Sequence, residues 1–284
     1  MKRYLFWILI PSLLIVTSVV SYFLYQQNSS KISQKQNLPF DFFSSLFDRD
    51  NGRNIKIQPK KIYAPILLYH KIVKVEPQDS YSVSPEIFDE QLTWLEENSY
   101  TVISMENLYA ALANDGDLPQ NPVVITFDDG NSDQYSNALP ILKKHRLSAT
   151  FFIKLNNVGK SGGMSWNQIR NLAKSGMTIG SHSVNHDNMS QMDEVTMRYE
   201  LVQSKKILEK ETGEKMKFFA YPGGAYSQAT IDATQNAGYL AAFTTHHNII
   251  QQIKKEDDLY TLARIHIDDE MPSFINWVQG INLK

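Results

Sequence analysis

VVITFDDG, residues 123–130, is the stretch that decides the fold of this chain. Its apolar and β-branched first half predicts a buried β-strand. Two adjacent carboxylates, Asp128 and Asp129, then meet Gly130. Side chains alternate along a strand, so both carboxylates serve one site only if the strand ends there, and Gly130 supplies that ending. Taken alone, Asp-Asp-Gly is also ordinary turn or helix-start chemistry.

A second polar motif, HSVNH, occupies residues 182–186, at the end of another predicted strand. If a helical turn follows, the i,i+4 spacing stacks His182 and His186 on one face. A carboxylate with two imidazoles is a ligand set for a catalytic divalent metal with one open position, and the second carboxylate is left free as a base. The two motifs together predict metal-assisted hydrolysis, although HSVNH alone would also fit two incidental surface histidines.

Strands and helices alternate through the rest of the chain. Apolar runs and helical spacing predict strands at 66–69, 100–104, 123–127, 149–153, 177–180, 218–221, 240–244 and 260–267, and helices at 85–95, 105–113, 132–145, 166–175, 193–212, 228–237 and 272–278. This alternation predicts parallel strands joined by crossover helices, in a closed or partly closed (β/α) barrel.

Catalytic residues of such barrels lie at the carboxyl ends of the strands. The residues that carry chemistry in this sequence lie at or near the ends of predicted strands: His70, Asp128, Asp129, His182, residues 222–224 and residues 264–266. His70 directly follows the first predicted strand, and we expect it to line the pocket.

The amino-terminal part has a different character. Lys2 and Arg3 precede an apolar, uncharged segment at residues 4–25. About 20 apolar residues span a bilayer, and the flanking charges favour a cytoplasmic amino terminus. We therefore expect residues 1–25 to be an uncleaved signal anchor, with secretion after signal cleavage as the alternative. Residues 26–61 are polar and predict a tether, which leaves a catalytic domain at 62–284, anchored to the cell membrane and outside the cytoplasm.

Composition excludes several classes of protein. The chain of 284 residues has no cysteine, so it has no disulfide framework, no lipid-attachment cysteine and no thiolate zinc site. Its formal net charge is −2 and it has no basic tract, which argues against nucleic acid as a partner.

Residues 126–130 (TFDDG) and 182–186 (HSVNH) resemble the motifs of the NodB-homology polysaccharide deacetylases, carbohydrate esterase family 4. The resemblance covers roughly residues 64–280. The start ILLYH at 66–70 and the helix with Phe88, Gln91, Leu92 and Leu95 are similar to members that act on surface β-1,6-linked poly-N-acetylglucosamine or on peptidoglycan. The resemblance implies a NodB-like barrel and hydrolysis of N-acetyl groups.

The family's roles transfer to matching positions. By this resemblance Asp128 is the general base, Asp129 is a metal ligand, and His182 and His186 are the other two ligands. Ser183 matches a position that buttresses the site. The metal implied is a divalent ion, for which we expect Zn²⁺.

The third motif departs from the family. Many members read Arg-Pro-Pro-Tyr-Gly where this chain has AYPGG at 220–224. Pro222 and Gly224 are kept, Ala220 replaces the arginine, and Gly223 replaces the aromatic residue whose amide serves as an oxyanion donor. Gly223 still offers an amide. The lost arginine normally orients the catalytic aspartate, and Arg264 is a candidate replacement.

The sequence also suggests further residues of the pocket. His266 lies two residues after Arg264 and faces the same side of a strand. The family places a histidine general acid near this point, so His266 is our first choice for that role; the alternative is a strand histidine that faces solvent. Side chains expected to contact the sugar, some by stacking, are Tyr221, Pro222, Tyr226 and Trp166, with core packing as the alternative for Trp166.

The expected function is removal of N-acetyl groups from N-acetylglucosamine units of a polysaccharide at the cell's own surface. One alternative is an O-acetyl esterase that acts on xylan or another acetylated glycan, because the same machinery cleaves an ester. The other is an inactive glycan-binding wall protein, which would predict a missing metal ligand.

Overall fold

The computed structural model of the chain describes residues 59–74, 80–114 and 116–281. The predicted signal anchor and nearly all of the predicted tether lie outside these residues. Within them, no helix combines the length and the apolar character that a bilayer crossing requires.

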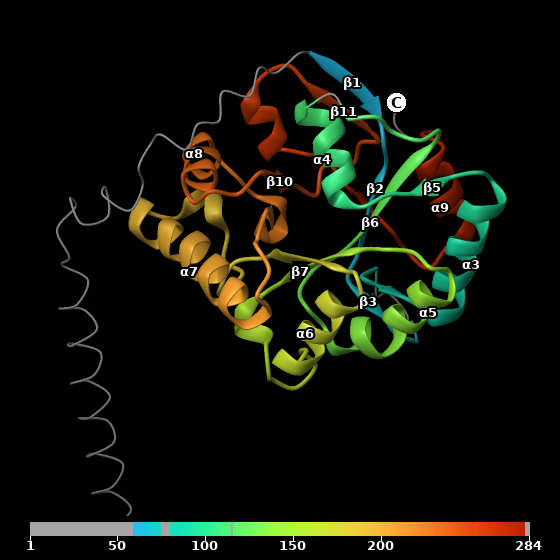
Figure 1. Cartoon of the computed structure of the whole chain (residues 1–284), viewed down its shortest axis with the longest axis horizontal. Helices are drawn as coiled ribbons and strands as arrows, with labels where there is room; N and C mark the ends of the chain where they lie inside the picture. Colours follow the sequence, from blue (N-terminus) through green and yellow to red (C-terminus); the bar gives the residue numbers. More distant parts are fainter. Residues whose placement is uncertain (1–58, 75–79, 115, 282–284) are drawn as a thin grey trace, which may run out of the picture. The chain divides into compact units, whose positions relative to one another are not determined.

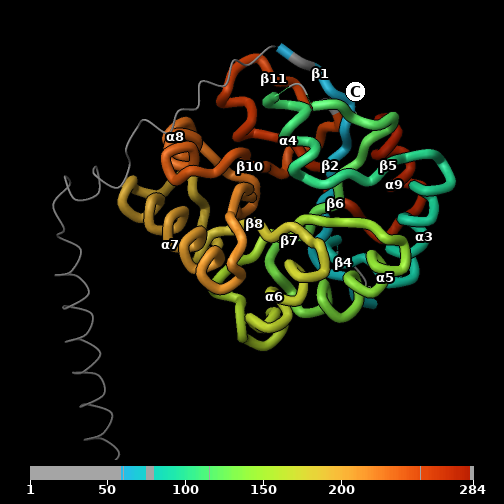
Figure 2. Tube along the Cα trace, viewed as in Figure 1, coloured from blue at the N-terminus to red at the C-terminus, as the bar shows by residue number. Residues whose placement is uncertain are grey.

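An eight-stranded parallel sheet forms the centre of the fold, in the order β10-β9-β8-β7-β6-β2-β12 with β5 paired to β6. Figure 2 shows β6, β7 and β8 side by side near its middle. The strands are β2 (Ile66–Tyr69), β5 (Thr101–Val102), β6 (Pro122–Phe127), β7 (Thr150–Ile153), β8 (Thr178–Ser181), β9 (Phe218–Ala220), β10 (Ala241–Phe243) and β12 (Ile265–His266).

The crossover helices surround this sheet (Figure 1). Serine residues cap the start of three of them: the Ser84 side chain accepts from the Ile87 amide, and Ser165 and Ser227 form capping boxes with Gln168 and Thr230. The helices are α3 (Pro85–Glu97), α4 (Met105–Asn114), α5 (Leu139–Lys144), α6 (Trp166–Lys174), α7 (Glu194–Thr212), α8 (Gln228–Asn236) and α9 (Met271–Val278).

One segment brings the two edges of the sheet together. Leu262 exchanges backbone hydrogen bonds with β10, donating to Ala242 and accepting from Thr244, while Ile265 and His266 pair with β2. The sheet is therefore curled and only partly closed. The predicted parallel (β/α) architecture is confirmed at this level.

Apolar side chains fill both faces of the central strands. Every residue of β2, β6 and β7 is buried. Phe127 stacks on Phe151 at 4.8 Å between ring centroids and on Tyr69 at 5.4 Å. The aromatic stack fixes the end of β6, and the polar residues that follow it start from a rigid base.

The predicted helix at 132–145 is wrong in detail, because it is interrupted. Residues Gln134–Ala138 form a π-helical turn in which the Leu139 amide donates to the Gln134 carbonyl. Pro140 has no N–H to donate, so the regular i→i−4 ladder fails at this point and a wider turn takes its place. The α-helix α5 begins only at Leu139.

Several short strands also differ from the sequence prediction. The strand expected at 260–267 reduces to Ile265–His266, because Glu256–Tyr260 form a 3₁₀-helix. An antiparallel pair of β1 (Lys60–Tyr63) with β11 (Ile250–Ile253) was not predicted, and β1 begins inside the predicted tether. A second small pair joins β3 (Lys71–Ile72) to β4 (Ser82–Val83).

Candidate active site

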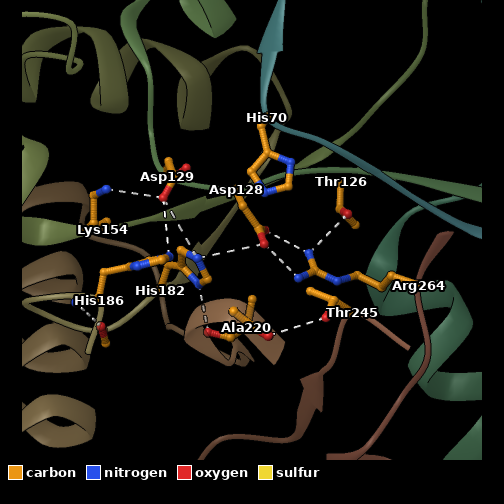
Figure 3. Close-up of polar contacts among 12 residues, drawn as sticks. His70, Thr126, Asp128, Asp129, Lys154, His182, His186, Ala220, Thr245 and Arg264 are labelled. Carbon is orange, nitrogen blue, oxygen red and sulfur yellow. Dashed lines mark hydrogen bonds and ion pairs between the residues drawn. The ribbon is translucent and has the colours of Figure 1, made fainter. Parts of the chain in front are cut away.

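The two aspartates after β6 point in different directions. The Asp128 amide still donates to the Tyr69 carbonyl at 3.0 Å, which extends the sheet by one residue. Asp129 then takes a positive φ of 74°, and Gly130 follows with 66°. Figure 3 shows Asp128 turned toward Arg264 and Asp129 turned toward Lys154 and the two histidines.

Asp128 forms a buried two-point ion pair with Arg264. Nη1 donates to Oδ1 and Nη2 donates to Oδ2, both at 2.7 Å, and the two side chains are 2% and 0% exposed. The guanidinium also donates to the Thr244 carbonyl at 3.0 Å and the Thr126 hydroxyl at 3.3 Å. Arg264 thus makes the contact with Asp128 that the family resemblance expects from an arginine at position 220.

This pair determines the charge of Asp128. Burial by itself would raise the pKa of Asp128, but the positive charge of Arg264 and its hydrogen bonds outweigh burial and hold the pKa well below its usual range. Asp128 is therefore an ionised carboxylate at neutral pH, which is the state that a base needs.

Asp129, His182 and His186 gather their ligand atoms within 4.8 Å of one another. The Asp129 Oδ1 atom lies 3.6 Å from His186 Nε2 and 4.0 Å from His182 Nε2. The predicted helical turn at 182–186 is wrong: Ser183 and His186 have positive φ values of 65° and 70°, and the segment is a loop. The loop still brings the two rings together, with centroids 4.8 Å apart.

The tautomer of His182 is fixed by the backbone. Its Nδ1 lies 2.8 Å from the Ala220 carbonyl, which only accepts, so Nδ1 carries the proton and the Nε2 lone pair faces Asp129. Burial lowers the pKa of His182 and keeps the ring neutral, as a ligand must be. One carboxylate and two imidazoles oriented in this way fit a divalent metal.

Two further polar residues at the site were not predicted. Lys154, directly after β7, donates to Asp129 Oδ1 at 3.2 Å, so a metal ion would compete with its ammonium group for this carboxylate. Gln134, placed by the π-helical turn, donates to the carbonyls of His70 at 2.6 Å and Asp128 at 2.5 Å. Lys154 follows a predicted strand, which was a usable signal; Gln134 offered none.

His70 and His266 lie next to each other, near Asp128. Their rings lie 5.3 Å apart, and Tyr81 packs against both, at 4.9 and 5.1 Å. Among the described residues, His70 Nδ1 and His266 Nε2 are buried without a hydrogen-bond partner. Burial lowers the pKa of His70, and burial together with the neighbouring His70 lowers that of His266 to about 4. Both rings are therefore neutral at pH 7.

The 220–224 stretch corrects one prediction. Tyr221 is completely buried and its hydroxyl faces Thr234, so its ring has no face for a sugar; Pro222 is buried as well. Tyr226, which is half-buried, stacks on Tyr221 at 5.6 Å and remains partly accessible, as does Trp166 at the start of α6. Gly223 has a φ of 60° and is exposed in the turn.

Comparison with known proteins places the chain in a family. Residues 115–242 match the family model described as polysaccharide deacetylase. The structure superposes on the Streptococcus pyogenes deacetylase PplD in complex with acetate with a TM-score of 0.69 and 30% identity, covering 77% of this chain and 97% of that one. The chain belongs to the polysaccharide deacetylase family.

Two other members of the family resemble this chain to a similar degree. A polysaccharide deacetylase from Bacillus cereus superposes with a TM-score of 0.68 at 27% identity, covering 78% of this chain and 69% of that one. The poly-β-1,6-N-acetyl-D-glucosamine N-deacetylase of Staphylococcus aureus (strain MSSA476) is 26% identical over 252 residues, which is 79% of this chain and 86% of that protein.

Replacement of Arg264 by methionine is expected to leave Asp128 as a buried, unpaired charge. Removing one partner of a buried ion pair costs about 3–5 kcal/mol, so the free energy of unfolding at pH 7 should fall by that amount. The measurement is urea unfolding of the protein after any metal has been removed with a chelator. The matched control is Asp128→Asn in the Arg264→Met background, which should recover most of the loss; an Arg264→Met protein as stable as the wild type would contradict the assignment.

The difference in stability between the wild type and Arg264→Met is expected to depend on pH. Folding lowers the pKa of Asp128 in the wild type, so the pair's contribution is present above about pH 4 and is lost as the pH falls through the folded pKa. In Arg264→Met, burial acts alone and raises this pKa, so Asp128 destabilises the variant as the pH rises above about 4. The stability difference should widen from pH 4 to 7, and a constant difference would speak against this account.

His182→Ala is expected to lose the metal. Metal content after dialysis, measured by mass spectrometry, should fall well below that of the wild type. The control is His145→Ala, because His145 is also mostly buried but lies between Asp89 and Glu96 at 2.7 and 3.2 Å. Wild-type metal stoichiometry in His182→Ala would disprove the ligand assignment.

Proposed function

We propose that this chain is a metal-dependent N-deacetylase that removes acetyl groups from N-acetylglucosamine units of a cell-surface polysaccharide, either peptidoglycan or exported poly-N-acetylglucosamine. The observation that carries the proposal is the joint placement of the Asp129, His182 and His186 ligand atoms within 4.8 Å, with the ionised Asp128 carboxylate 3.8 Å from His182. The names of the staphylococcal and streptococcal relatives support it.

Asp129, His182 and His186 would hold the metal, and we propose Zn²⁺ because one carboxylate and two neutral imidazoles suit it and leave one position open. When bound, such an ion acidifies water and polarises the acetyl carbonyl. The remaining chemistry falls to residues of the chain itself.

Asp128 is proposed to take the proton of the attacking water. Its Oδ2 faces the ligand cluster, 3.8 Å from His182 Nε2, and its other contacts come from Arg264. Arg264 acts as a positioning residue: a two-point contact fixes the plane of the carboxylate and keeps it ionised.

The oxygen that becomes negative in the reaction needs a hydrogen-bond donor. We propose the amide of Gly223, because this residue is exposed and follows by three positions Ala220, whose carbonyl orients His182. The leaving nitrogen needs a proton. We assign this step to the pair of imidazoles. Because both rings are neutral at rest, the proton that Asp128 takes from the water must first pass to His266, which then gives it to the leaving nitrogen, with His70 beside it. Among the described residues, each ring has a buried nitrogen without a hydrogen-bond partner.

Membrane attachment is a separate proposal that rests on sequence. Residues 4–25 are apolar and follow two positive charges, so the domain is proposed to stay at the outer face of the cell membrane. The partner it would meet there is an acetylated polysaccharide of the same cell.

The function is tested by acetate release from β-1,6-linked N-acetylglucosamine oligomers and from peptidoglycan strands, with acetylated xylan in parallel. We expect release from the N-acetylated glycans, and a fall of about 10²–10⁴-fold in kcat for Asp128→Asn with metal content retained. Asp187→Asn, the same change at an exposed neighbouring position, should keep wild-type activity.

Three other outcomes would contradict parts of this proposal. Release from xylan alone would replace the amide substrate with an ester. No release from any glycan by the metal-loaded protein would favour an inactive glycan-binding protein. An Asp128→Asn variant with near-normal turnover would remove the base assignment.

The anchor is tested by fractionation. The full chain should stay in the membrane pellet after an alkaline carbonate wash, at its uncleaved mass, and added protease should reach it in spheroplasts. The control is the chain without residues 1–25. A shortened, soluble product in the medium would show cleavage of the signal instead.

A further inference from the structure

Glu200 is a buried carboxylate that the proposed reaction does not use. It lies on α7 and is 1% exposed. Its Oε2 accepts hydrogen bonds from the amides of Val184 at 2.8 Å and Asn185 at 2.9 Å, and its Oε1 accepts from the Asn185 side-chain amide at 2.7 Å. All three donors belong to the loop between His182 and His186.

This loop has a conformation that it does not favour by itself. Ser183 and His186 both have positive φ, and the His186 amide donates to the Ser183 hydroxyl at 2.9 Å. Left-handed conformations at residues other than glycine persist only where the surroundings determine them. The shape of the loop must therefore be imposed by its contacts.

Two elements impose the shape of the loop: one donates hydrogen bonds to its carbonyls, and the other accepts hydrogen bonds from its amides. The chain after β7 satisfies the carbonyls, because the amides of Leu155 and Asn156 donate to Ser183 and Val184 at 3.2 and 2.8 Å. Glu200 satisfies the amides. A carboxylate is suited to this task because it only accepts, and two oxygens offer sites for all three donors.

Glu200 is itself held in place. The Ser204 hydroxyl donates to the Glu200 carbonyl at 2.6 Å, and the Ser181 hydroxyl donates to Ser204 at 2.8 Å. Ser181 is the last residue of β8 and directly precedes His182. Helix α7 is thus fastened to the strand that carries the first histidine, while Glu200 holds the loop that carries the second.

We propose that Glu200 is a positioning residue that sets the metal affinity of this site, by fixing the loop that places His186 opposite His182 and Asp129. The inference rests on the metal site of the proposed function and is independent of the substrate.

The experiment compares three replacements by the dissociation constant for Zn²⁺, measured by competition with a chelator without substrate. Glu200→Met removes the acceptors and should weaken binding about 10–100-fold. Glu200→Asp keeps the charge but withdraws the acceptors, and should also weaken it. Glu200→Gln keeps an oxygen in reach of both backbone amides, and the exposed Asn185 amide can turn to accept, so its affinity should stay closest to that of the wild type.

The matched control is Glu194→Met on the same helix, where the glutamate side chain is 73% exposed and pairs with Arg198 one turn away. Its affinity for Zn²⁺ should equal that of the wild type. Urea unfolding of each metal-free protein gives the second readout, since a merely structural role would lower stability without changing the dissociation constant.

The outcomes separate this inference from the proposed function. An unchanged dissociation constant in a folded Glu200→Met protein would overturn the inference, and so would a Gln variant weaker than the Asp variant, because charge would then matter more than position. If Glu200→Met does not fold, the comparison of Asp with Gln decides alone. Failure of the wild type to bind Zn²⁺ would instead remove the proposed function.

Discussion

The buried ion pair between Arg264 and Asp128 organises the centre of this molecule. A buried ion pair is costly to desolvate, so it persists only when the geometry is good and the remaining donors are satisfied. Here the contact is two-point and Arg264 also donates to Thr244 and Thr126. Arg264 lies between the residues that pair with β10 and those that pair with β2, so the same contact fixes where the curled sheet closes.

The division of roles between the two aspartates follows from that contact. Arg264 holds Asp128 ionised and oriented, and the backbone then turns through a positive φ at Asp129, which sends the next carboxylate to the opposite side. Adjacent residues thereby serve different purposes within one pocket. The carbonyl of Ala220 fixes the tautomer of His182. The charge that orients Asp128 comes from Arg264, in a different segment of the chain.

A second layer of contacts supports the ligands. Glu200 and the start of the segment after β7 define the His182–His186 loop, and Gln134 ties the ends of β2 and β6 together. Such partners matter because a metal site is only as accurate as the side chains and backbone that orient its ligands. They come from α7, from the chain after β7 and from the π-helical turn at Gln134–Ala138.

Sequence by itself determined the elements whose cause is local. The run at 123–127 is a strand because it is apolar and β-branched, the serine caps begin helices, and the alternation of elements gave the parallel sheet. It also predicted which residues gather at the candidate site, because Asp128, Asp129, His182 and His186 lie at strand ends that a parallel sheet brings to one edge. The break at Pro140 also has a local cause, the missing N–H of proline, whereas the burial of Tyr221 was decided by tertiary packing.

Only the tertiary structure decided how these residues are held. Arg264 and Asp128 are separated by 136 positions, and no local pattern records that their side chains meet. The spacing of HSVNH suggested a helical turn. Instead, the amides of Val184 and Asn185 donate to Glu200 on α7, and the segment is held as a loop. Local sequence fixes which groups are present; the buried charges and hydrogen bonds between distant segments fix their geometry, because those contacts exist only after the chain has folded.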